Sequence, residues 1–112
     1  MDTVDFSFEF YNEVPHLEHL EGELRAEAES RLRELAADHT DMIGASVAIE
    51  ELTGDMTPHR YQVRVVAYMR PDNVAAVEKG ETIEAALNGA LAAVERQVRE
   101  YRNKLREQWK SP

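Results

Sequence analysis

Three stretches of the chain alternate between apolar and polar residues, the pattern of strands that bury one face of a sheet, and a short fourth strand is expected after a turn at residues 71–73. The four segments cover approximately residues 4–11, 43–50, 59–70 and 74–78. The apolar face of the first stretch consists of Val4, Phe6, Phe8 and Phe10. The second and third predicted inward faces consist of Ile43, Ala45, Val47 and Ile49, and of Tyr61, Val63, Val65, Ala67 and Met69. The pattern therefore predicts four strands.

Two other stretches repeat apolar residues every three or four positions, which predicts amphipathic helices. The first helix is expected over about residues 15–37, with Pro15 in the first turn, where the missing N–H of proline costs nothing. The second begins near Thr82, a residue type that caps helix N-termini. Its predicted apolar stripe consists of Leu87, Leu91, Val94, Val98, Tyr101, Leu105 and Trp109. Residues 53–58, TGDMTP, are expected to form a hairpin loop.

The resulting order is β-α-β-β-β-α. Because each strand has one polar face, this order predicts an α+β fold with one four-stranded sheet and two helices packed on one face. The other face of the sheet is left open to solvent or to a partner. The chain has 112 residues and shows no internal repeat or linker. We therefore expect a single domain over residues 1–112.

Charge is distributed unevenly along the chain. The net charge is −9, yet the last 18 residues carry six basic and three acidic residues, a net charge of +3. The other 94 residues carry seven basic and 19 acidic residues, a net charge of −12. The overall charge argues against general nucleic-acid binding by the whole surface. A nucleic-acid contact must therefore use a local basic patch.

The arginines of the last helix form such a patch. On a helical wheel Arg96, Arg99, Arg102, Arg106 and Lys110 share an arc of about 120° beside the apolar stripe. Guanidinium groups bind phosphate through paired hydrogen bonds, which favours contact with RNA phosphates. If the two helices lie side by side, Arg31 and Arg33 of the first helix extend the patch. The alternative is a solvated helix whose cations are stabilised by the C-terminal end of its dipole.

Other chemistry finds little support in the sequence. The chain has no cysteine, and His16 and His19 lack further ligands at metal-binding spacing. No motif for catalysis or phosphate cradling occurs, so we expect no enzyme activity, no cofactor, no metal and no small-molecule substrate. No apolar run reaches the about 18 residues that span a bilayer, and the N-terminus lacks a signal-peptide pattern. We therefore expect no membrane partner and a cytoplasmic location.

Three segments resemble one protein family: HRYQV at residues 59–63, VAAVEKGETIEAAL at 74–87 and ERQVREYR at 95–102. The family is that of the ribosome hibernation promoting factors, which includes protein Y and was once described as sigma-factor modulation proteins. The likeness covers nearly the whole chain and has the same element order. The GET opening of the last helix and the ERQVR run are its more specific parts. The chain resembles the short form, without the additional C-terminal domain of long members.

The resemblance implies a translation inhibitor that binds ribosomal RNA of the small subunit and occludes the channel for messenger and transfer RNA. Carried over by position, the RNA-binding residues are Arg31, Arg33, Arg96, Arg99, Arg102 and Arg106. Two features depart from the family: the first helix is unusually acidic, and the turn after the first strand keeps only Asn12 of the usual pattern. The alternative is a protein-interaction module of the same fold, which acts through the acidic helix or forms a homodimer through the open sheet face.

Overall fold

The structure is a computed structural model that describes residues 6–14, 18–37, 39–52 and 60–110, without the side chains of residues 108–110. The predicted order β-α-β-β-β-α is confirmed. The elements are β1 (Ser7–Asn12), α1 (Glu18–Ala36), β2 (Met42–Glu51), β3 (Tyr61–Met69), β4 (Val74–Gly80) and α2 (Ile83–Lys110). The predicted hairpin loop at residues 53–58, Val4, Pro15 and His16 lie outside the described residues.

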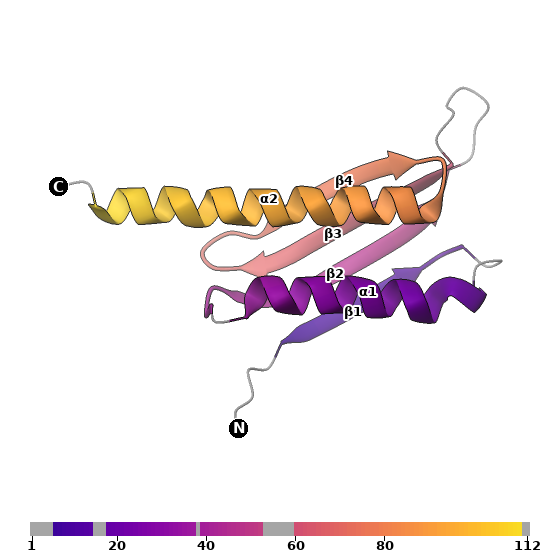
Figure 1. Cartoon of the computed structure of the whole chain (residues 1–112), viewed down its shortest axis with the longest axis horizontal. Coiled ribbons are helices and arrows are strands. Elements are labelled where there is room, and N and C mark those ends of the chain that lie inside the picture. The colour runs from indigo at the N-terminus through magenta and orange to yellow at the C-terminus, as the bar shows by residue number, and fades with distance from the viewer. Residues whose placement is uncertain (1–5, 15–17, 38, 53–59, 111–112) are drawn as a thin grey trace.

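The four strands form one mixed sheet in the order β1-β2-β3-β4. β1 pairs with β2 in parallel because α1 returns the chain to the starting end, whereas β2, β3 and β4 are antiparallel neighbours. Both helices cover the same face, α1 over β1 and β2 and α2 over β3 and β4 (Figure 1). The expected α+β layers are therefore present, and none of the described helices and strands covers the second face of the sheet.

The core lies between the sheet and the helices. The inward faces of β2 and β3, apart from the partly buried Tyr61, and the apolar stripe of α2 as far as Val98 are almost completely buried. Phe6, Phe8 and Phe10 are only partly buried, because β1 is the outermost strand. α2 is much longer than the sheet, and its C-terminal end projects beyond the turn between β3 and β4 (Figure 1). Leu105, near this projecting end, is accordingly only half-buried.

One predicted inward residue points outward. Ile43 was expected in the core, but its side chain is 42% exposed, and Met42 takes the buried position instead. The reason is a β-bulge: Met42 pairs with Met69 and Gly44 with Tyr68, so Ile43 is an extra residue on β2. A regular period of two cannot reveal such an insertion, because one additional residue exchanges the faces of its neighbours.

The predicted N-cap of α2 is confirmed. The Thr82 hydroxyl accepts a hydrogen bond of 3.1 Å from the backbone N–H of Ala85, and Glu84 lies in the first turn. This cap fixes where α2 leaves β4. The cap therefore fixes the start of the helix that carries the arginines of the predicted patch.

The close contact between β1 and β2 depends on Gly44. A Cβ atom added there would lie 2.6 Å from the Ser7 carbonyl oxygen, so a larger residue must push the strands apart. We expect Gly44→Ala to lower the free energy of unfolding by about 1–3 kcal/mol, as overpacking does. Gly22 in α1 is the matched control, because an added Cβ meets nothing within 4 Å. Gly22→Ala should stabilise the protein by about 1 kcal/mol. Urea denaturation measures both, and a neutral Gly44→Ala would contradict the pairing.

Candidate nucleic-acid interface

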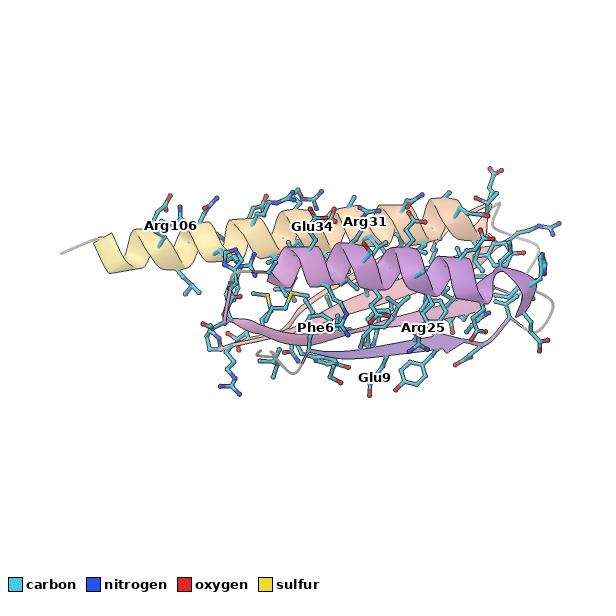
Figure 2. The ribbon with its side chains drawn as sticks, turned by 60° about the horizontal axis from the view of Figure 1, so that its bottom comes forward. Phe6, Glu9, Arg25, Arg31, Glu34 and Arg106 are labelled. Carbon is cyan, nitrogen blue, oxygen red and sulfur yellow. The ribbon has the colours of Figure 1, made fainter. Side chains whose placement is uncertain are left out.

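The two helices lie side by side on the sheet, as the extended patch requires (Figures 1 and 2). A bridge of polar side chains joins them. Arg31 of α1 donates two hydrogen bonds to the Glu95 carboxylate of α2, of 2.8 and 3.2 Å, and a third of 3.2 Å to Asn88. The hydrogen bond to Glu95 raises the pKa of the Arg31 guanidinium above its ordinary value. All three of these hydrogen bonds from Arg31 therefore go to side chains of α2.

Arg102 makes a second and more enclosed bridge. Its guanidinium donates two hydrogen bonds to the Asp41 carboxylate, of 2.8 and 2.9 Å, and one of 3.1 Å to the Leu35 carbonyl oxygen. Leu35 lies in the last turn of α1, where carbonyl groups lack helical partners. The side chain of Arg102 is only 12% exposed. We call the contacts of Arg102 with Asp41 and Leu35 the Arg102 clamp. It ties α2 to the end of α1 and to the loop before β2.

The clamp also changes the acidity of Asp41. Hydrogen bonds from Arg102 hold the pKa of the Asp41 carboxyl below its ordinary value, although partial burial acts in the opposite direction. The backbone carbonyl of Asp41 accepts a hydrogen bond of 2.9 Å from the Arg70 N–H at the end of β3. Asp41 therefore connects α2 with the end of β3.

Arg33 lies on the opposite flank of α1 from Arg31. It forms an ion pair of 2.8 Å with Glu29, and its guanidinium lies 5.0 Å from the centre of the Phe6 ring. Arg25 makes a similar contact of 5.7 Å with Phe8. These cation–π contacts cover partly buried rings at the edge of the sheet. Arg33 remains about half exposed but faces away from α2.

The remaining predicted residues, Arg96, Arg99 and Arg106, are exposed on α2. Within the described part of the chain, none of them makes a hydrogen bond or an ion pair. At 1.5 Å per residue they extend over about 15 Å of the helix. Arg106 lies on the projecting end of α2 (Figure 2). We call these three residues the cationic stripe.

A shallow polar groove of about 290 Å³ lies between the helices, next to the stripe. Its walls carry both basic and acidic side chains: Arg31, Glu34, His39, Glu95, Arg99 and Arg102. Glu34 and Glu95 would repel an anion deep in the groove. The groove therefore favours contacts made at its rim, where Arg99 belongs to the cationic stripe.

Six arginines predicted as one patch thus occupy different environments. The structure brings Arg31, Arg99 and Arg102 together around the groove, whereas Arg33 lies on the far flank and Arg106 on the projecting end. Sequence reasoning missed Asp41 and Glu95, the carboxylates that engage two of the arginines. Only the angular position of Arg102, the arginine closest to the apolar stripe on the helical wheel, hinted at an inward role.

Among residues 6–14, 18–37, 39–52 and 60–110, no group of three or more His, Cys, Asp or Glu side chains is placed to hold a metal ion. None of the described helices is both long and apolar enough to cross a membrane.

Known proteins share this sequence pattern and fold. The sequence model of the family described as Sigma 54 modulation protein / S30EA ribosomal protein matches residues 16–106. No curated protein matches the chain. A ribosomal subunit interface protein from Coxiella burnetii superimposes with a TM-score of 0.65 at 9% identity, over 87% of this chain and 98% of its own. The N-terminal domain of Protein Y from Thermus thermophilus does so with a TM-score of 0.62 at 17% identity, over 85% and 94%.

The Arg102 clamp predicts a pH-dependent contribution to stability. We expect Asp41→Asn to lower the free energy of unfolding by about 1–3 kcal/mol at pH 7, because charged hydrogen bonds are lost. A carboxyl whose pKa is depressed in the folded state stabilises above its unfolded pKa, and this contribution disappears as the pH falls through the folded pKa. The difference in the free energy of unfolding between wild type and Asp41→Asn should therefore shrink as the pH is lowered from about 5 to about 2.

Urea denaturation at several pH values measures this difference. Asp72→Asn is the matched control, because Asp72 is an exposed aspartate in the turn between β3 and β4. A difference that stays constant with pH would contradict a stabilising Asp41 carboxylate.

Proposed function

This chain belongs to the Sigma 54 modulation protein / S30EA ribosomal protein family, and from this premise we propose that it binds ribosomal RNA of the small ribosomal subunit and inhibits translation. Binding would occlude the channel used by messenger and transfer RNA. Such an inhibitor acts by occupying space and needs no catalytic group. The name of the similar Coxiella burnetii protein, a ribosomal subunit interface protein, supports a ribosomal partner.

The observation that carries the proposal is the cationic stripe. Arg96, Arg99 and Arg106 are exposed, and the described residues leave their guanidinium groups available for phosphate oxygens. Each phosphate that a guanidinium neutralises releases condensed counterions, which favours binding. Because the stripe lies on one helix, the backbone positions of its three arginines are fixed before binding. This reduces the entropy lost when the complex forms.

We propose a different part for Arg31 and Arg102. Their contacts with Glu95 and Asp41 hold the two helices at a fixed spacing, so they orient the stripe. Arg33, half exposed on the other flank of α1, would serve as a separate contact with RNA. The six arginines therefore form two groups. Arg33 and the cationic stripe would contact RNA, whereas Arg31 and Arg102 would position the helix that carries the stripe.

The acidic surface of α1 complements this division. Glu18, Glu23, Glu27 and Glu34 are exposed on α1. Their charge repels phosphate wherever the cationic stripe does not compensate it. We propose that this repulsion suppresses binding to RNA in general. The ribosomal site would remain the favoured partner because it would contact the cationic stripe in one orientation.

A protein-interaction module remains the second candidate, and the same acidic helix favours it. In that case a basic protein would bind α1 and the stripe would stay solvated. The two candidates differ in which charges they need. Ribosome binding requires the arginines of α2, whereas binding of a basic protein requires the glutamates of α1.

We expect Arg99→Glu/Arg106→Glu to reduce co-sedimentation with purified small ribosomal subunits at least about 10-fold at low salt, because two phosphate contacts become repulsive. The two residues lie two helical turns apart on one side of α2. Both side chains are exposed, so the variant should keep its helical content, which circular dichroism measures.

Arg60→Glu/Arg70→Glu is the matched control. Arg60 and Arg70 flank β3, are exposed and change the net charge by the same amount. This variant should pellet with the subunit nearly as wild type does. Equal losses in both variants would indicate that only net charge matters, and no loss in either would eliminate the stripe as the binding surface.

A further inference from the structure

The uncovered face of the sheet is the largest feature that the proposed function leaves unused. On its two central strands Ser46 and Ala48 of β2 lie beside Val66 and Arg64 of β3. The Tyr68 hydroxyl of β3 donates a hydrogen bond of 3.4 Å to Glu9 of β1. Tyr11 and Val77 lie on this face with 52% and 43% of their surface exposed. They are two of the three large hydrophobic residues that are exposed in the described part of the chain. A sheet face with exposed apolar groups is suited to contact with another protein surface.

The charges on this face are divided between its two halves. The half formed by β1 and β2 carries Glu9 and Glu50, and Glu13 continues the same side just beyond β1. The half formed by β3 and β4 carries Arg64 and Lys79. Among the described residues on this face, acids are therefore confined to one half and bases to the other.

The register of the strands places the two exposed apolar residues at opposite edges of the sheet, one in the acidic half and one in the basic half. Tyr11 pairs with Ala48, Ala48 with Arg64 and Arg64 with Val77, so Tyr11 and Val77 are the two ends of one row across the sheet. They lie at equal distances from the middle of the sheet, on opposite edges. A rotation that exchanges the two edges therefore brings Tyr11 of one copy opposite Val77 of the other.

We propose that the open sheet face is a self-association surface that binds a second copy of this chain. The two-fold axis would run between the two sheets, parallel to the strands. This symmetry places the β1–β2 half of each copy against the β3–β4 half of its partner. Glu9, Glu13 and Glu50 then face the half that carries Arg64 and Lys79, and two Tyr11–Val77 contacts form. Both helices stay outside the interface.

The area of the face determines how strong the dimer is. Four strands spaced about 4.8 Å apart, with about seven residues at about 3.3 Å each, give a face of about 450 Å². Two such faces bury about 900 Å², below the about 1,200 Å² of stable protein interfaces. We therefore infer a weak dimer that dissociates on dilution. Electrostatic complementarity would select the orientation of the two copies more than it would add affinity.

Sedimentation equilibrium of the full chain tests this proposal. The average mass should rise from the 12.8 kDa of one chain toward twice that value between about 1 µM and 1 mM, the range of a weak interface. Arg64→Glu should raise the dissociation constant at least about 10-fold, because it places like charges together. The charge exchange Glu50→Arg/Arg64→Glu should restore most of the affinity, and Tyr11→Ala should weaken association without changing any charge.

Arg96→Glu is the matched control, because it makes the same change of charge on the outer side of α2. It should leave self-association unchanged, whereas Arg64→Glu should leave ribosome co-sedimentation unchanged, so the two proposals fail independently. A chain that stays monomeric over the whole range would overturn the dimer. A dissociation constant that neither Arg64→Glu nor Tyr11→Ala changes would overturn this face as the interface. The same follows if Arg96→Glu weakens association as much as Arg64→Glu does.

Discussion

The burial of the apolar stripe of α2 against β3 and β4 fixes the direction of every other side chain on that helix. Leu87, Leu91, Val94 and Val98 are almost completely buried, so α2 cannot rotate without exposing them. Each arginine then has a role that depends on its angle from the apolar stripe on the helical wheel. Arg102, closest to it, turns toward α1 and Asp41, whereas Arg96 points away from the sheet.

This constraint explains which parts of the fold the sequence could predict. Periods of two and of 3.6 residues arise directly from burial of one face, so all six elements and their order were predictable. The inward position of Ile43 was not, because the bulge at Met42 and Gly44 depends on how β2 pairs with β3. The partial exposure of Phe6 and Phe8 likewise depends on β1 being the edge strand, which is a property of the assembled sheet.

The candidate site was predictable only in its residue types. A helical wheel shows that arginines share a flank, but it cannot show which acids from distant segments will meet them. Glu95 is 64 positions from Arg31 in the sequence, and Asp41 is 61 positions from Arg102. Such pairs form only after both helices have packed on the sheet. The structure therefore narrows the proposed RNA contact on α2 to Arg96, Arg99 and Arg106.

An acidic protein with a small cationic stripe should bind RNA in a strongly salt-dependent way. The most direct test of the central claim is the affinity of the wild-type chain for small ribosomal subunits as a function of salt concentration. Four phosphate contacts, three from the stripe and one from Arg33, predict that the logarithm of the affinity falls linearly with the logarithm of salt, with a slope of about −3 to −4. An affinity that does not change with salt, or no binding even at low salt, would contradict phosphate recognition by the stripe.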